Sequence, residues 1–126
     1  MKKEIAQQWV AALRSGKYQQ GTGALKIGDK YCCLGVLCDI SDQATWEVDT
    51  EYPLPDRNDK IYEYFGVEDV LPDDVMRWAG MQSNSGVIPG LSEAPFDKTE
   101  LVFYNDDLEY TFNQIADIIE ENWEHL

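Results

Sequence analysis

The most constraining feature of the sequence is the run 31–39, which reads Tyr-Cys-Cys-Leu-Gly-Val-Leu-Cys-Asp and contains all three cysteines of the chain. An element this apolar has to be covered on most of its sides. Its apolar residues recur with the i, i+3, i+4, i+7 spacing of a helix: Cys33, Val36, Leu37 and Ile40. We therefore expect a core helix over residues 33–41, although a run of this length also suits a buried strand. Gly35 inside it costs about 1 kcal/mol relative to alanine, which indicates a close approach by another backbone.

Amphipathic helices are predicted near both ends of the chain. Over residues 2–15 the apolar side chains fall on one side, and a glycine follows as a stop. Over residues 112–124 an apolar stripe follows Thr111 and Gln114, which have the spacing of a capping box. A shorter helix is expected at 71–80, with proline in its first turn and glycine at its end. The expected core contains Trp9, Leu34, Leu37, Cys38, Trp78, Ile115 and Ile119.

Short strands are predicted between these helices. Gly28 and Asp29 suit the two-residue turn of a tight hairpin, which we expect to pair with a later strand. The strands are expected at residues 24–27, 30–33, 46–48, 61–65, 87–88 and 100–104. The chain has the length of one ordinary domain with a single core. We therefore expect an α+β fold, a single compact domain over residues 1–126 with three or four helices packed on a small antiparallel sheet.

Charge is distributed unevenly along the chain, whose net charge is −14. Residues 1–30 contain six basic and two acidic side chains, a net charge of +4. The remaining 96 residues contain four basic and 22 acidic side chains, a net charge of −18. A field of this sign disfavours direct binding to a nucleic-acid backbone or to an anionic membrane. It is compatible with a partner protein that has a basic surface, with mimicry of a polyanion, or with a surface that serves solubility alone.

The cysteines and the lack of a long apolar run indicate a soluble protein of the reducing cytoplasm. Three thiols in one short run invite a metal site or a nucleophile. A fourth soft ligand is lacking, however, and the single histidine, His125, is expected to fray near the end of the chain. We therefore expect buried structural thiols, no cofactor, no metal site and no catalytic residues.

The middle of the chain combines carboxylates with aromatic side chains. Such a segment suits a protein interface or a ligand pocket, because tyrosine and tryptophan are enriched at binding surfaces. The candidate interaction surface consists of Glu47, Asp49, Glu51, Tyr52, Asp56, Asp59, Tyr62 and Tyr64.

Four stretches of the chain, taken in order, form a recognisable pattern. They are residues 12–21, the cysteine run, a helix over 71–81 that closes in Trp-Ala-Gly-Met, and residues 105–119. In this order they resemble a family of small uncharacterised proteins of bacteriophages and prophages, for which Tyr-Cys-Cys-Leu-Gly-Val-Leu-Cys-Asp is the specific signature. The signature and core residues are Tyr31, Cys32, Cys33, Gly35, Cys38, Asp39 and Trp78. The resemblance implies a phage context, and it assigns neither an activity nor a catalytic residue.

The leading hypothesis is a non-enzymatic, acidic accessory protein of phage type that binds and modulates a host macromolecule, as a host-takeover or counter-defence inhibitor. Its expected partner is a host protein with a basic surface, met in the cytoplasm of the host cell. One alternative is a protein that binds or sequesters a small ligand such as a nucleotide signal, which the aromatic residues favour and the shortage of Arg and Lys opposes. The other alternative is an enzyme of unknown class.

Overall fold

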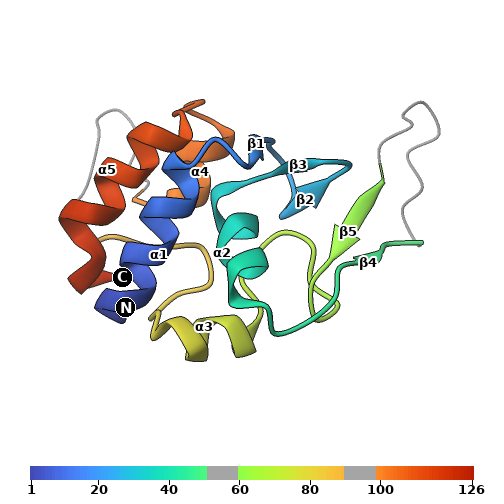
Figure 1. Cartoon of the computed structure of the whole chain (residues 1–126), viewed down its shortest axis with the longest axis horizontal. Helices are drawn as coiled ribbons and strands as arrows, with labels where there is room; N and C mark the ends of the chain where they lie inside the picture. The colour runs from blue at the N-terminus through green and yellow to red at the C-terminus, as the bar shows by residue number, and fades with distance from the viewer. Residues whose placement is uncertain (51–59, 90–98) are drawn as a thin grey trace.

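The structure is a computed structural model that describes residues 1–50, 60–89 and 99–126, and it confirms the α+β fold (Figure 1). The elements follow in the order α1 (Lys3–Arg14), β1 (Gln19–Gln20), β2 (Lys26–Ile27), β3 (Lys30–Tyr31), α2 (Cys33–Ser41), β4 (Glu47–Val48), β5 (Ile61–Glu63), α3 (Asp73–Ala79), α4 (Leu101–Asp106), α5 (Phe112–Asn122) and the 3-10 helix η1 (Trp123–His125). The four predicted helices, the hairpin and the strands near residues 47 and 62 are therefore confirmed.

Helix α2, formed by the cysteine run, lies between the other helices and the sheet (Figure 1). Every side chain from Cys33 to Cys38 is buried. A Cβ atom on Gly35 would lie only 2.8 Å from the carbonyl carbon of Leu25, just before β2. The same Leu25 carbonyl accepts a hydrogen bond from the backbone N–H of Cys32. The expected close approach of another backbone at Gly35 is thus confirmed.

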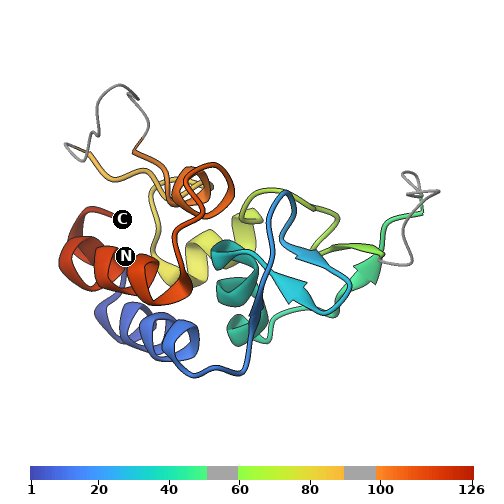
Figure 2. The ribbon, with the colours of Figure 1, turned by 90° about the horizontal axis from the view of Figure 1, so that it is seen from above.

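Helices α1 and α5 pack side by side on the side of α2 away from the sheet (Figures 1 and 2). Trp9 of α1 is fully buried, and its indole Nε1–H donates to the Cys33 carbonyl at 2.9 Å. At the exposed edge of the pair, Arg14 lies 2.5 Å from Asp117 and 3.0 Å from Glu120 of α5. Thr111 and Gln114 form the predicted capping box at the start of α5.

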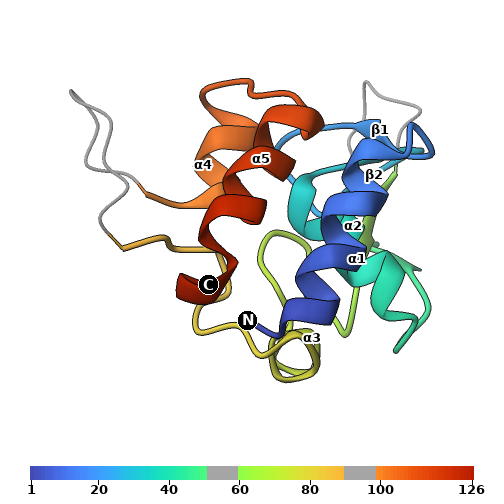
Figure 3. The same ribbon diagram turned by 60° about the vertical axis from the view of Figure 1, so that its left-hand side comes forward.

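Both ends of the chain lie beside α3 (Figure 3). The Lys2 N–H donates to the Ala79 carbonyl at 2.8 Å, and the Gln82 N–H donates to the Leu126 carbonyl at 2.8 Å. The expected fraying of His125 is wrong, because the residue belongs to η1 and the next side chain, Leu126, is buried in the core.

The sheet has the strand order β1-β3-β2-β5-β4. Its pairs are antiparallel except β1 with β3, which is parallel, so the sheet is mixed where a purely antiparallel one was expected. β1 is also held from outside the sheet, because the Gln20 side chain donates to Asn105 Oδ1 of α4 at 2.9 Å and to the carbonyl of Tyr110, in the loop after α4, at 2.7 Å.

The strand expected over residues 100–104 is wrong, since this segment forms α4. A helix turns Leu101, Tyr104 and Asn105 toward one side, and all three are buried. The buried Asn105 amide bonds to two other segments, because Oδ1 accepts from the Cys33 N–H at 3.2 Å and Nδ2 donates to the Gly21 carbonyl at 2.9 Å. These tertiary bonds override the strand propensity of Val-Phe-Tyr.

Two smaller expectations also change. The strand expected at 87–88 is reduced to a single bridge between Val87 and Glu100. Trp78 is only partly buried and packs against the edge of the core, whereas the other predicted core residues are fully enclosed. None of the described helices has both the length and the apolar character that crossing a membrane requires.

Candidate functional site

The three cysteines of α2 serve the core. All are free thiols and buried, and burial raises the pKa of each of them, that of Cys32 to about 12. A thiol with so high a pKa is a poor nucleophile at neutral pH. The prediction that the cysteine run contains buried structural thiols is confirmed.

Asp39, the last residue of the signature, organises the aromatic side chains next to the sheet. Its carboxylate accepts a hydrogen bond from the Tyr18 hydroxyl at 2.6 Å and another from Trp46 Nε1 at 3.0 Å. Burial, followed by the bond to Asp39, raises the pKa of Tyr18. The carboxylate therefore holds two rings from different segments in one place, which is a structural role for the end of the signature.

A row of directly paired residues crosses four strands of the sheet. From β4 to β3 it consists of Val48, Tyr62, Lys26 and Tyr31. The Lys26 ammonium lies 4.5 Å from the ring centre of Tyr62, 5.2 Å from that of Tyr31 and 5.6 Å from that of Trp46. Three aromatic rings around a cation form a favourable cage. Here the cage is filled by the protein's own lysine.

The predicted interaction surface is only partly exposed. Glu47 is exposed and Tyr62 half-buried, as an interaction surface requires. Asp49 and Tyr64 are buried, with exposed fractions of 7% and 1%, and the prediction that they contribute exposed surface is wrong. Tyr64 turns inward because its hydroxyl accepts hydrogen bonds from the backbone just after α2. Glu51, Tyr52, Asp56 and Asp59 lie outside the described residues.

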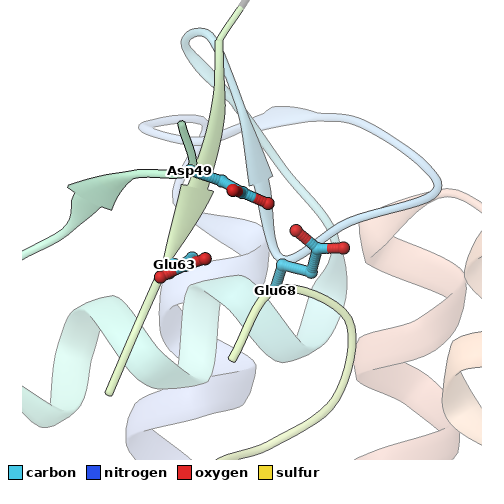
Figure 4. Close-up of side chains that lie close together, drawn as sticks. All are labelled: Asp49, Glu63 and Glu68. Carbon is cyan, nitrogen blue, oxygen red and sulfur yellow. The ribbon is translucent and has the colours of Figure 1, made fainter. Parts of the chain in front are cut away.

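The carboxylate of Asp49 instead joins a cluster that we call the acidic cluster, formed by Asp49, Glu63 and Glu68 (Figure 4). The three come from the end of β4, from β5 and from the loop after β5, and one oxygen of each lies within 4.8 Å of the others. Asp49 reaches this position because its N–H donates to the Ile61 carbonyl at 2.8 Å, which continues the pairing of β4 with β5. Glu47 lies directly opposite Glu63 in the same pair.

Electrostatics in the acidic cluster favour an added proton or cation. The hydrogen bond with Asp49, then burial, then the negative charges of Asp49, Asp69 and Glu63 raise the pKa of Glu68 to about 7. The buried oxygen Oε2 of Glu68 receives no hydrogen bond from the described residues. Three carboxylates supply hard oxygen ligands of the kind that Ca²⁺ and Mg²⁺ use, but Ca²⁺ takes six to eight oxygens, so the cluster by itself is an incomplete cage.

A family model described as a domain of unknown function, DUF8296, matches residues 1–123 of the chain. The chain belongs to the DUF8296 family. No curated protein and no solved structure matches it. All three residues of the acidic cluster of this DUF8296 chain fall within the matched residues 1–123. The acidic cluster therefore lies within the family domain. The resemblance to bacteriophage proteins stays a prediction.

The sequence analysis missed Glu63 and Glu68 as site residues of the DUF8296 chain. A signal for Glu63 was present, because alternate residues of β4 and β5 face the same side of a sheet, and acidic residues occupy 47, 49 and 63. Glu68 gave no such signal, since a loop and not a strand places it. Of the two missed residues, Glu68 is the one whose pKa is raised by its neighbours.

Two large apolar side chains are exposed in the described part of this DUF8296 chain. They are Val48 of β4, at 41%, and Phe65 just after β5, at 44%. Val48 directly precedes Asp49 of the acidic cluster along the chain, and Phe65 comes two residues after Glu63. Val48 pairs with Tyr62, one register position away from the Glu47–Glu63 pair, so it faces the other side of the sheet from these carboxylates.

Proposed function

We propose that this DUF8296 protein is a binding protein rather than an enzyme, and that it holds a basic segment of a partner protein at the acidic end of its sheet. The observation that carries the proposal is the convergence of the three carboxylates of the acidic cluster, with Glu47 directly opposite Glu63. Like charges directly opposite each other in a sheet destabilise it. A basic side chain of a partner relieves that repulsion.

Two arginines and one lysine of the described residues make contacts outside the acidic cluster. Ion pairs within the described residues are formed by Arg14, with α5, and by Arg77, with Asp74 of its own helix. Lys26, the lysine of the neighbouring strand, extends its ammonium over aromatic rings. The carboxylates of β4 and β5 present a negative field to an incoming partner, and such a field speeds the association of oppositely charged proteins.

The same geometry weighs against nucleotide binding as the function. A base stacked on the rings of Tyr31 and Tyr62 has to displace the Lys26 ammonium, and the acidic chain repels its phosphate. We therefore place the basic protein ahead of the nucleotide signal as ligand. The resemblance to bacteriophage proteins makes a bacterial host the expected source of the partner, and its cytoplasm the expected location.

The test is capture from bacterial lysate on immobilised protein, followed by elution with a salt gradient. We compare the unchanged protein with the triple variant Glu47→Gln, Glu63→Gln and Glu68→Gln. The matched control removes three charges elsewhere, from the exposed side chains Glu4, Glu121 and Glu124. At pH 8, above the pKa of Glu68, both variants have nearly the same net charge, so a difference between them reports the position of the charge and not its amount.

The proposal predicts a basic protein that binds the unchanged protein and the control variant and is lost from the acidic-end variant. That protein should elute at moderate salt, because exposed charge pairs are screened. Equal recovery by the two variants, or capture of acidic proteins and nucleotides alone, refutes the proposal.

A further inference from the structure

We infer that the turn at Phe65 and the groove beside it form a docking site for an arginine side chain in the basic segment of the partner. This inference rests on the proposed function, since it names the side chain that the partner supplies and a contact surface next to the acidic cluster. Phe65 lies just beyond β5, two residues after Glu63 and three before Glu68.

Phe65 has a backbone conformation that disfavours its side chain. Tyr64 and Val67 exchange two backbone hydrogen bonds, at 2.8 and 3.1 Å, and so enclose a two-residue turn. Both central residues have positive φ, 52° at Phe65 and 74° at Gly66. This is the type I′ pattern, in which Asn-Gly is strongly preferred, and a bulky side chain at positive φ is strained.

The same side chain is exposed, so burial does not compensate for the strain. Its 44% exposure is the largest among the exposed large apolar side chains of the described segments. Phe65 does touch Tyr64, with ring centres 5.4 Å apart. Tyr64 is already anchored, however, by hydrogen bonds from Gln43 N at 2.9 Å and Ala44 N at 2.8 Å and by the ring of Trp46 at 4.8 Å. A residue that is strained and exposed at once indicates a function outside the fold.

An open groove of about 340 Å³ lies next to the Phe65 ring. Val67, Val70, Leu71 and Pro72 contribute apolar surface to its lining. The carboxylates of Asp73 and Asp74 and the amide of Asn84 contribute polar surface. The groove thus combines an aromatic ring, apolar walls and negative charge. These features are complementary to a side chain that has a cationic group on an apolar stem.

Arginine fits this combination better than lysine. Its planar guanidinium stacks on an aromatic ring and forms paired hydrogen bonds with a carboxylate, whereas the lysine ammonium is a compact and strongly hydrated charge. Asp74 already pairs with Arg77 at 2.6 Å. Asp73, exposed and without an ion pair in the described part of the chain, is the carboxylate that receives the arginine. The arginine stem lies along Val70 and Pro72.

The test titrates the full-length, ¹⁵N-labelled protein with the capped peptide Arg-Leu-Arg and, in parallel, with Lys-Leu-Lys. We expect backbone amide shifts at Phe65, Val70 and Asp73, and binding of the lysine peptide that is weaker by about three-fold. The variant Phe65→Asn gives the turn its preferred residue and removes the ring. It should keep or raise the urea midpoint of unfolding and lose most of the peptide response.

Two further variants complete the design. Val48→Thr changes the other exposed apolar side chain and should leave the peptide response unchanged. Asp73→Asn leaves the turn and the Phe65 ring intact and should weaken arginine binding. A lower urea midpoint in Phe65→Asn overturns the inference, because it shows that the fold itself requires the ring.

The failure of this inference is distinguishable from the failure of the proposed function. Amide shifts confined to β4 and β5, with no effect of Phe65→Asn, overturn the docking site and leave the acidic sheet end as the contact surface. The absence of any shift also overturns the docking site, and the capture experiment then decides the proposed function separately. Equal responses to the two peptides refute the choice of arginine.

Discussion

Replacing Glu68 by glutamine should stabilise the protein at alkaline pH. Glu68 is held next to Asp49 and Glu63, and its hydrogen bond with Asp49, its burial and the nearby charges raise its pKa to about 7. At pH 8 the folded protein therefore holds ionised Glu68 close to Asp49 and Glu63. Glutamine has the same shape, carries no charge and can donate an N–H to Asp49.

The magnitude follows from the rise in pKa. A change from the ordinary 4.5 to about 7 corresponds, at about 1.36 kcal/mol for each pH unit, to an upper limit of about 3.4 kcal/mol. The side chain of Glu68 is only half-buried, and solvent screening reduces the expected effect to about 1–2 kcal/mol. Between pH 4.5 and 7 the folded state binds more protons than the unfolded state, so the contribution of Glu68 to the free energy of unfolding falls as the pH rises. The stabilisation that protonated Glu68 gives the folded protein is complete below about pH 4.5 and lost above about pH 7.

The assay is urea denaturation of the unchanged protein and of Glu68→Gln at several values between pH 5 and pH 8. The variant should be more stable by about 1–2 kcal/mol at pH 8, and the difference should shrink steadily toward pH 5. Other titrating groups cancel in this difference, because they are common to both proteins. Glu121→Gln, which removes an exposed charge from α5, is the matched control and should show no such pH dependence.

Two results refute the reasoning. One is a difference between Glu68→Gln and the unchanged protein that does not vary between pH 5 and pH 8. The other is a difference that grows as the pH falls, which means that ionised Glu68 stabilises the fold.

Two further predictions concern α2. Gly35→Ala should destabilise the protein by about 3 kcal/mol, because the new Cβ meets the Leu25 carbonyl; Gly16→Ala, at positive φ in open space, should cost only about 1 kcal/mol by the same urea assay. Equal losses contradict the close approach as the cause. The three buried thiols should react with a disulfide reagent at pH 8 only as fast as the protein unfolds, because burial raises their pKa, that of Cys32 to about 12. Rapid labelling of one thiol in native protein contradicts this assignment.

Local patterns were sufficient for most of the helices. The capping box at Thr111 and the one-sided stripe after it define α5, and the i, i+3, i+4, i+7 spacing after Cys32 defines α2. Even the close contact at Gly35 was predictable, since a glycine inside a helix is unfavourable without a packing reason. These features depend on residues within a few positions of one another, which is the range over which helix propensity and periodicity act.

The sequence pattern failed where distant residues decide the outcome. Val-Phe-Tyr at 102–104 has strand propensity, yet the amide of Asn105 is bonded to segments around Gly21 and Cys33, and only a helix presents it there. The acidic surface was predicted as a linear segment, but pairing of β4 with β5 buries Asp49 and brings it to Glu63 and to a loop residue.

An acidic α+β domain with a buried cysteine helix can be inferred from composition and short-range periodicity alone. Which carboxylates converge, and which aromatic ring is left exposed, becomes visible only in the folded chain. Close like charges and a strained turn are unfavourable locally, so local sequence patterns do not predict them. Their positions follow from strand register and packing across the whole fold, which hold Glu68 beside Asp49 and leave Phe65 at the surface.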